Sequence, residues 1–291
     1  MVAEPFRTLR WSTWLGWQIE SNWADWKLFI LYLVVKPITG SMVLVCMYFA
    51  AKAAAPTRVP AAFLSYVYVS NACFGLVGCV MLGMSQVVAT DRDHYQMLKY
   101  IFRSPGRFRV YFVGRGLARA VEGVVGGGIT ILAGTLFFPD VRTAVAAVDP
   151  GWLFLFLVVG SVMLWACGMF LASAVLNMHR NGMFLSEGVA GVVYLLSGVI
   201  FPLAILPVPL QWIGRALPTT YWLEGMRRAI TGPAPEGSAL AQSPLARMAN
   251  GEILVLLVGT TVGLVVVAEW FYRWSVRRAW RNGKIEETSG M

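Results

Sequence analysis

The chain has 291 residues, of which 57% are hydrophobic and only 13% are charged, and its mean hydropathy is +0.63. This composition excludes an ordinary soluble domain of the same length and is typical of a polytopic membrane protein. The formal net charge of +9 does not indicate nucleic acid, because the basic residues cluster beside long apolar runs, as they do at membrane surfaces.

Residues 5–27 are predicted to form an interfacial elbow helix. Trp11, Leu15, Ile19, Trp23 and Trp26 recur at spacings of three or four residues, which places them on one helical face. Trp beside basic residues favours a helix that lies in the plane of the bilayer surface. An amphipathic helix packed on another domain is the alternative.

Six apolar segments predict six transmembrane helices within a single all-α domain that covers residues 1–291. Each is close to the roughly 20 residues that cross about 30 Å of hydrocarbon. They are residues 28–51, 61–88, 110–138, 152–176, 188–206 and 253–272. Six spans put both termini on one side, and that side carries sixteen Lys and Arg residues against seven on the other. The positive-inside rule therefore predicts a multi-pass protein of the cell (inner) membrane, with cytoplasmic termini and a cytoplasmic tail at 273–291.

Several residues inside the spans are predicted to hold helices together. Gly123 and Gly127 form a small-xxx-small face, which predicts close approach to a neighbouring helix. Polar residues in the spans either line a path or bond a neighbouring helix, and the sequence leaves both readings open. Lys36 lies just inside the first span and can extend to the cytoplasmic surface.

Charged pairs near the span ends are expected to anchor the helices at the membrane boundary. Arg119 and Glu122 are three residues apart, and Glu269 and Arg273 are four apart, so each pair can form an ion pair on one helix face. The sequence contains no GxxxxGK[ST], HExxH or GxSxG motif. We therefore expect no enzyme activity, no metal and no nucleotide site in this chain.

The loop after the second predicted span reads DRDHYQMLKYIFRSP from Asp91. Its apolar residues Met97, Leu98, Ile101 and Phe102 share one helical face, and a proline follows. A short amphipathic helix over 91–103 is predicted, which either lies on the lipid surface or docks into a soluble partner.

A broken stretch follows the fifth predicted span. The segment LSGVIFPLAILPVPLQWIGRALPTTYWLEGMRR, residues 196–228, contains four prolines that prevent one continuous helix. Apolar and polar residues alternate after Pro207, which predicts short re-entrant helices over 207–231, half-buried at the external interface. Residues 231–251 are rich in Pro, Gly, Ala and Ser and are predicted to form an external loop.

Together, the elbow helix before a first span that begins at a proline, the loop that closes with Ser-Pro, and the proline-rich turn resemble the permease subunits of type-2 ABC transporters. The family's ending "lP..y...g.R" is matched by Leu217, Pro218, Tyr221, Gly225 and Arg227. One departure lies in the loop, where many members carry Gly-Thr and this chain has Tyr95, Gln96 and Met97.

This resemblance implies a dimer of six-span permeases, identical or homologous, bound to two cytoplasmic ABC ATPase subunits that hold ATP and Mg. Docking on the ATPase would involve Asp91, Arg92, Asp93, Met97, Leu98, Ile101, Phe102, Ser104 and Pro105. Polar residues on the first, second and fifth spans would line the substrate path, namely Thr39, Ser41, Ser70, Asn71, Tyr194 and Ser197. An external gate would contain Pro207, Trp212, Pro218, Tyr221 and Trp222.

The function implied is export of a hydrophobic or amphipathic substrate, such as a drug, a natural product or a lipid-like molecule, by alternating access. Export of a lipid-linked glycan by the same mechanism is one alternative. A membrane-embedded lipid-modifying enzyme and a scaffold that recruits a soluble partner are alternatives of other classes.

Overall fold

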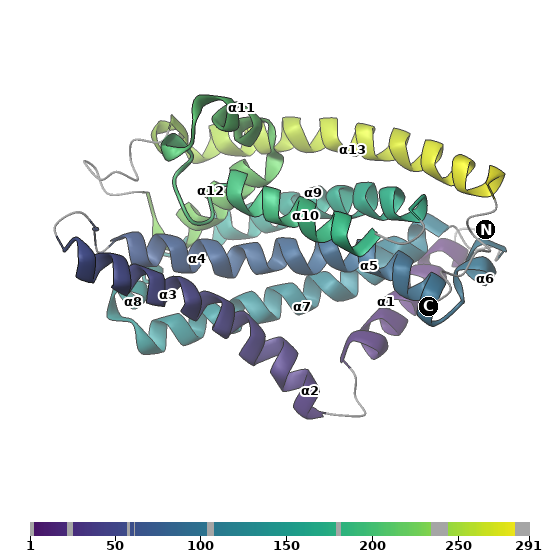
Figure 1. The fold of residues 1–291 in the computed structure, drawn as a ribbon, viewed down its shortest axis with the longest axis horizontal. Helices are drawn as coiled ribbons and strands as arrows, with labels where there is room; N and C mark the ends of the chain where they lie inside the picture. The colour runs from purple at the N-terminus through teal and green to yellow at the C-terminus, as the bar shows by residue number, and fades with distance from the viewer. Residues whose placement is uncertain are drawn as a thin grey trace.

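The computed structural model describes residues 3–21, 26–56, 59–60, 62–103, 108–178, 182–233 and 244–282. The chain is all-helical, as predicted, and none of these residues forms a strand. The long helices run along a common direction as one bundle (Figure 1).

The helices follow one another along the chain with short connections. The first half contains α1 (Ala3–Ser21), α2 (Trp26–Ile30), η1 (Leu31–Val35), α3 (Lys36–Ala54), α4 (Ala62–Val77), η2 (Gly78–Leu82), α5 (Gly83–Ala89), η3 (Thr90–His94), α6 (Leu98–Arg103) and α7 (Phe108–Phe137). The second half contains α8 (Pro139–Val145), α9 (Pro150–Leu176), α10 (Gly182–Leu196), η4 (Leu203–Ile205), α11 (Val208–Ala216), α12 (Pro218–Thr231), η6 (Pro244–Arg247) and α13 (Asn250–Arg281).

Five helical segments of the described chain are long and apolar enough to cross a membrane. They are Leu31–Ala54, Ala62–Arg92, Arg109–Phe137, Pro150–Leu176 and Asn250–Arg281. The first two contain π-helical turns at η1, η2 and η3, a widening of the helix that is frequent at functional sites.

The prediction of a transmembrane helix over 188–206 is wrong at its C-terminal end, where α10 is the helix observed. It begins at Gly182 and ends at Leu196, and its 15 residues extend about 22 Å, which is less than the hydrocarbon thickness. Gly198 adopts a φ of 76°, which a helix does not accommodate, and Pro202 follows. The prediction of six full spans is therefore not confirmed.

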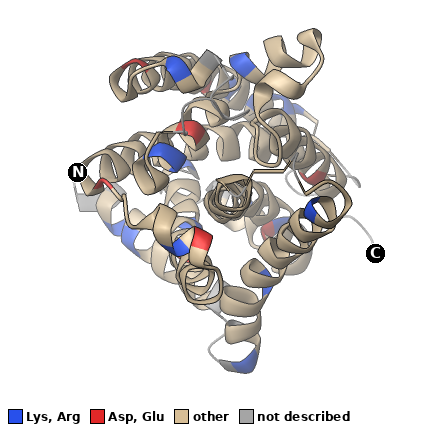
Figure 2. Ribbon diagram, turned by 90° about the vertical axis from the view of Figure 1, so that its left-hand side faces the viewer, with Lys and Arg blue, Asp and Glu red and all other residues tan. Residues whose placement is uncertain are grey.

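The second span, α4 to η3, is the most buried of the five. It packs against α3, α7, α9, α10 and α12. In the view along the bundle, one helix is seen end-on with the others arranged around it, and charged residues are sparse (Figure 2). Because this span contacts so many elements, its buried side chains and those of its neighbours form one hydrophobic core.

Close approach between α7 and the second span confirms the predicted glycine face. A Cβ atom at Gly123 would lie 2.7 Å from Leu76 Cδ1, and one at Gly127 would lie 3.1 Å from the Ala72 carbonyl oxygen. Side chains at these two positions would push the helices apart.

Both predicted ion pairs are also confirmed. Arg119 Nη1 lies 3.2 Å from Glu122 Oε2, and Arg273 Nε lies 2.6 Å from Glu269 Oε1. Glu269 additionally contacts Arg109 Nη1 at 2.7 Å, so the carboxylate joins α13 to the start of α7.

The N-terminal helix α1 packs along α7 at the end of the bundle that also holds α6 (Figure 1). Ser12 is buried in that contact, and a Cβ atom at Gly16 would lie 3.0 Å from Ala118 Cβ. Trp11 and Trp14 remain exposed on the outside, which suits a membrane surface. Trp23 of the predicted interfacial face lies outside the described residues, and the interfacial location of α1 stays a prediction.

Candidate functional site

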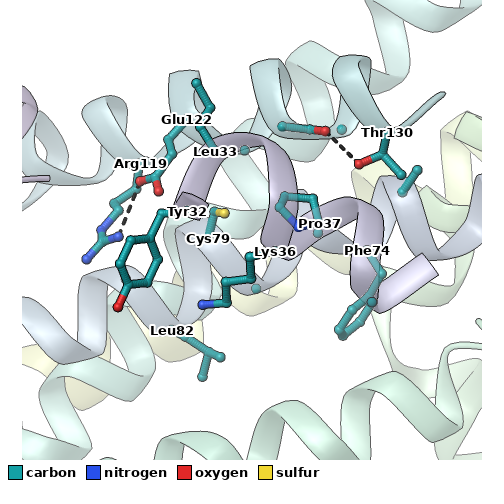
Figure 3. A pocket seen from close by; sticks show the side chains of 18 of the residues that line it. Tyr32, Leu33, Lys36, Pro37, Phe74, Cys79, Leu82, Arg119, Glu122 and Thr130 are labelled. Carbon is teal, nitrogen blue, oxygen red and sulfur yellow. Dashed lines mark hydrogen bonds and ion pairs between the residues drawn. The ribbon is translucent and has the colours of Figure 1, made fainter. Parts of the chain in front are cut away.

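A cleft of about 590 Å³ lies between the first, second and third spans. Seven of its lining residues are glycines, namely Gly40, Gly75, Gly78, Gly83, Gly123, Gly126 and Gly127. Because glycines lack side chains, the helix backbones themselves form much of the wall. Aromatic, aliphatic and charged side chains complete it (Figure 3).

The charged groups of this cleft lie together. Figure 3 shows Arg119 and Glu122 beside Tyr32, with the amine of Lys36 directed toward the same side and Phe74 and Thr130 at the opposite side. Lys36 Nζ lies 5.5 Å from the centre of the Tyr32 ring, within the range of a cation–π contact. Because the Thr130 hydroxyl donates to the Gly126 carbonyl of its own helix, the cleft has a charged end and a mainly apolar end.

Three of the six predicted path residues form one hydrogen-bonded chain across three helices. Asn71 Nδ2 donates to Ser41 Oγ at 2.9 Å, and Tyr194 donates its hydroxyl hydrogen to Asn71 Oδ1 at 3.0 Å. Asn71 also lines the cleft. Ser41 is fully buried, so this chain joins α3, α4 and α10 beside the cleft.

The other three predicted path residues do not line the cleft. The hydroxyl of Thr39 bonds its own helix at the Val35 carbonyl. Ser197 Oγ lies 2.6 Å from Thr219 Oγ1, and Ser70 Oγ accepts a hydrogen bond from Arg227 Nε at 3.0 Å. Ser70 and Ser197 therefore fasten α12 to the bundle.

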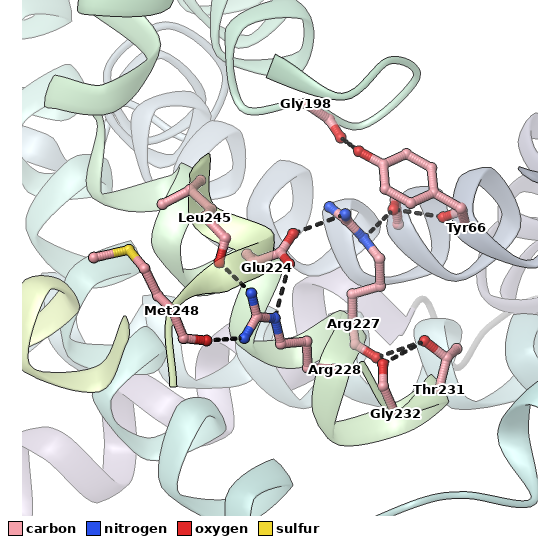
Figure 4. Close-up of polar contacts among 10 residues, drawn as sticks. Tyr66, Gly198, Glu224, Arg227, Arg228, Thr231, Gly232, Leu245 and Met248 are labelled. Atoms are coloured by element: carbon pink, nitrogen blue, oxygen red, sulfur yellow. Dashed lines mark hydrogen bonds and ion pairs between the residues drawn. The ribbon is translucent and has the colours of Figure 1, made fainter. Parts of the chain in front are cut away.

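The helix α12 carries a buried ionic cluster (Figure 4). Glu224 accepts hydrogen bonds from Arg227 Nη1 and from Arg228 Nε, each at 2.9 Å. Arg227 also lies 3.8 Å over the ring of Tyr66 in α4, whose hydroxyl donates to the Gly198 carbonyl.

A second set of bonds extends the cluster toward the next helix. Arg228 donates to the carbonyls of Leu245 and Met248, just before α13 begins. One carboxylate and two guanidinium groups thus join three segments of the chain, α12, α4 and the stretch before α13, and the Tyr66 hydroxyl adds the turn at Gly198.

The predicted gate residues have two different environments. Trp212 is 66% exposed on α11, which begins after Pro207 and presents an apolar surface. The location of α11 at the membrane interface stays a prediction. Trp222 is fully buried, and its Nε1 donates to the Phe156 carbonyl at 3.0 Å.

The prediction that α12 lies half-buried at the interface is wrong. Pro218 and Tyr221 are also buried, and almost every residue of α12 faces another part of the chain. The helix α12 is buried because it packs on α9, where Gly160 leaves room for Trp222. A Cβ atom at Gly160 would overlap that side chain. The helix α12 is part of the core.

The predicted coupling helix over 91–103 is also not one helix. Asp91 and Arg92 lie in η3, at the end of the second span, and the chain then turns at Gln96, which has a φ of 50°. A separate helix, α6, begins at Leu98. Since left-handed backbone cannot continue a right-handed helix, the turn separates the two pieces.

Asp91 and two apolar residues of this segment, Leu98 and Ile101, face inward. Asp91 is fully buried; its Oδ2 accepts a 2.6 Å hydrogen bond from Tyr111, and its Oδ1 lies 3.7 Å from Arg115 Nη2. Leu98 is buried in the main core, and Ile101 packs against the same core.

The outer face of the segment differs from the predicted docking face. Exposed residues are His94, Tyr95, Gln96 and Tyr100, while Met97 is half-buried. Arg92 donates to the Met178 carbonyl at 3.0 Å. Ser104 and Pro105 lie outside the described residues, as do the side chains of Asp93 and Phe102.

Sequence reasoning missed the contribution of α7 to the cleft. The path was expected between the first, second and fifth spans, yet Arg119 and Glu122 line the cleft from the third. Arg119 lies ten residues after Arg109, the first residue of this candidate span, and pairs with Glu122 in the cleft wall. A charged residue within a span is a functional signal, and the anchoring of this pair at the membrane boundary stays a prediction.

Comparison with known proteins identifies one family. The family model described as "ABC-2 type transporter" matches residues 7–231. No curated protein matches the chain. The matched region includes α1, the cleft, the segment at 91–103 and α12. No group of His, Cys, Asp and Glu side chains in the described part of the chain could hold a metal ion.

Proposed function

We propose, from the premise that this chain belongs to the ABC-2 type transporter family, that it is the permease subunit of an ATP-driven exporter. Its substrate is a hydrophobic or amphipathic molecule, such as a drug, a natural product or a lipid-like compound, which moves outward from the cytoplasmic side. Permeases of this family pair with ABC ATPase subunits. Two such ATPases, which hold ATP and Mg, and a second permease complete the transporter.

The observation that carries this proposal is the cleft with one charged and one apolar end. Such a cleft suits a molecule that has a polar head and a hydrocarbon body. Its charged end is formed by Arg119 and Glu122 (Figure 3), which lie in the first half of α7, the helix that follows α6 in the chain. The basic residues counted around that end support a cytoplasmic location for it.

The segment at 91–103, which we call the coupling segment, contacts the same helix, α7, that forms part of the cleft wall. Asp91 contacts Tyr111 and Arg115 on α7, and Arg119 follows Arg115 by one helical turn. A displacement of the segment by an ATPase would therefore act on α7 and on the cleft wall. This is a two-state rearrangement of packed helices, driven by the different contacts that the partner makes in each state.

A reconstitution experiment tests the proposal. The chain is co-purified with its ATPase and inserted into vesicles, where ATP-dependent movement of a fluorescent amphiphile is measured. We expect Tyr100→Glu to weaken ATPase co-purification and transport without lowering permease stability, because Tyr100 is 64% exposed on the outer face of α6. Trp212→Glu, on the opposite end of the bundle, serves as the matched control for co-purification.

Two results would contradict the proposal. One is that the intact wild-type chain co-purifies with no ATPase under any condition. The other is equal accumulation of the amphiphile with ATP and with a non-hydrolysable analogue.

A further inference from the structure

We infer that the cleft between the first three spans selects amphiphiles with an anionic head group, such as a phosphate ester or a carboxylate, and disfavours cationic ones. This inference rests on the proposed export function and specifies its substrate class. It concerns the charge of the head group, which neither the family model nor the overall composition determines.

The first argument is the charge of the lining. Two cations, Lys36 and Arg119, and one carboxylate, Glu122, line the cleft, so the sum of +1, +1 and −1 leaves one net positive charge. Glu122 is already engaged with Arg119 at 3.2 Å. Among the described residues, no carboxylate forms an ion pair with Lys36, whose amine faces the ring of Tyr32.

The second argument is the position of that lysine. Lys36 lies five residues inside the first membrane-crossing segment, which begins at Leu31. A charged amine within a span is compensated either by water, when the side chain extends to the membrane surface, or by a partner in the protein or its ligand. An anionic head group between Lys36 and Arg119 would supply that partner through charge-assisted hydrogen bonds.

The third argument is the shape of the cleft around a bound tail. Pro37 and Phe74 lie on the side away from Arg119 and Glu122 (Figure 3). The glycines on the second and third spans leave room along the wall between them, where the small side chains of Ala72 and Cys79 also lie. A head group at the charged end would thus place its hydrocarbon tail along the apolar end, where burial is favourable.

Binding can be measured without the ATPase. The purified full-length chain, in nanodiscs of zwitterionic lipid, is titrated with three fluorescent probes that share one dodecyl chain and carry a phosphate, a hydroxyl or a trimethylammonium head. We expect the phosphate probe to bind about tenfold or more tightly than the trimethylammonium probe, which is the range of one charge-assisted contact.

Variants of Lys36 assign the preference. Lys36→Met should reduce binding of the phosphate probe to that of the hydroxyl probe, Lys36→Arg should retain it, and Lys36→Glu should invert the preference toward trimethylammonium. Lys52→Met is a matched control, since Lys52 lies on the same helix at the same 5.5 Å from a tyrosine ring, Tyr48, but does not line the cleft.

The inference is overturned if the three probes bind alike, or if Lys36→Met leaves phosphate binding unchanged or weakens all three equally. These outcomes leave the exporter proposal intact, because ATP-dependent transport is measured separately. Conversely, loss of ATP-dependent transport with charge-selective binding preserved would contradict the exporter and not the head-group preference.

Discussion

At the scale of single residues, Trp222 shows how an aromatic side chain of a predicted gate serves the core. Its indole is fully buried between α12 and α9, with its N–H bonded to Phe156. Trp→Ala at such a site removes a large apolar contact and leaves a cavity. We expect Trp222→Ala to reduce the free energy of unfolding by about 3–5 kcal/mol.

Thermal unfolding of the detergent-solubilised chain checks this expectation. Trp212→Ala is the control, since the Trp212 side chain is mostly exposed and should change the midpoint little. A similar loss of stability in both variants would contradict the assignment of Trp222 to the core.

A second residue-scale prediction concerns the carboxylate of Glu224. It neutralises part of the charge of two buried guanidinium groups, Arg227 and Arg228. Removal of one member of a buried ionic group is strongly destabilising, by about 3–5 kcal/mol, because the remaining charges lose their partner. We expect Glu224→Gln to lower the unfolding midpoint clearly, whereas Glu187→Gln, at an exposed position of α10, should not. Retained stability in Glu224→Gln would argue against this ionic cluster.

Sequence patterns predict contacts along one helix far better than contacts between helices. The pairs Arg119–Glu122 and Glu269–Arg273 follow from spacing alone. The bond from Arg227 to Ser70 joins residues 157 positions apart, and no spacing rule encodes it. For the same reason, the sequence gives no sign that Ser70 bonds α12, and its place in a substrate path stays a prediction.

At the scale of helices, the contact of α7 with the second span depends on small residues. Position 127 faces the Ala72 carbonyl, whereas a Cβ atom at Gly128 would meet nothing within 4 Å. We expect Gly127→Val to cost about 1–3 kcal/mol through overpacking, while Gly128→Val should be near neutral. The two variants have the same change in composition and in helix propensity.

Their comparison therefore isolates packing. Unfolding midpoints and binding of the anionic probe are measured for both. Equal behaviour would show that the close approach of the helices does not limit stability.

The coupling segment illustrates where an amphipathic pattern is ambiguous. Its apolar face predicts burial, but the pattern does not say whether the covering surface is a partner, lipid or the same chain. Leu98 is covered by its own bundle, so the residues left for a partner are the polar and aromatic ones around Tyr100. The positive φ of Gln96 divides the segment. The sequence gives no strong signal for it, because non-glycine residues adopt positive φ values only uncommonly.

At the scale of the molecule, composition and hydropathy sufficed to predict an all-helical membrane protein, and the motif at 217–227 sufficed for its family. The length of α10 and the burial of α12 could not be predicted from the sequence, since they depend on how the chain folds back after Gly198. The cleft likewise depends on the distance between helices. Two of its glycines, Gly123 and Gly127, were interpreted as packing residues, and they both pack and line the cleft.

A final prediction follows from the place of Cys79 in the cleft wall. If the cleft is part of an alternating-access path, its exposure to water differs between the two states of the transporter. A single-cysteine chain is made by replacing Cys46, Cys73 and Cys167 with alanine, and is assembled with its ATPase. We expect the rate of Cys79 modification by a small water-soluble maleimide to change at least several-fold when the ATPase is held by a non-hydrolysable ATP analogue.

The matched control retains only Cys46, which is exposed on α3 and does not line the cleft, and its rate should be the same in both states. The phosphate-headed probe should also slow modification of Cys79 and not of Cys46, since a bound tail covers the cleft wall. A Cys79 rate that is unaffected by nucleotide would place the moving path elsewhere in the transporter, even if the probe protects the thiol.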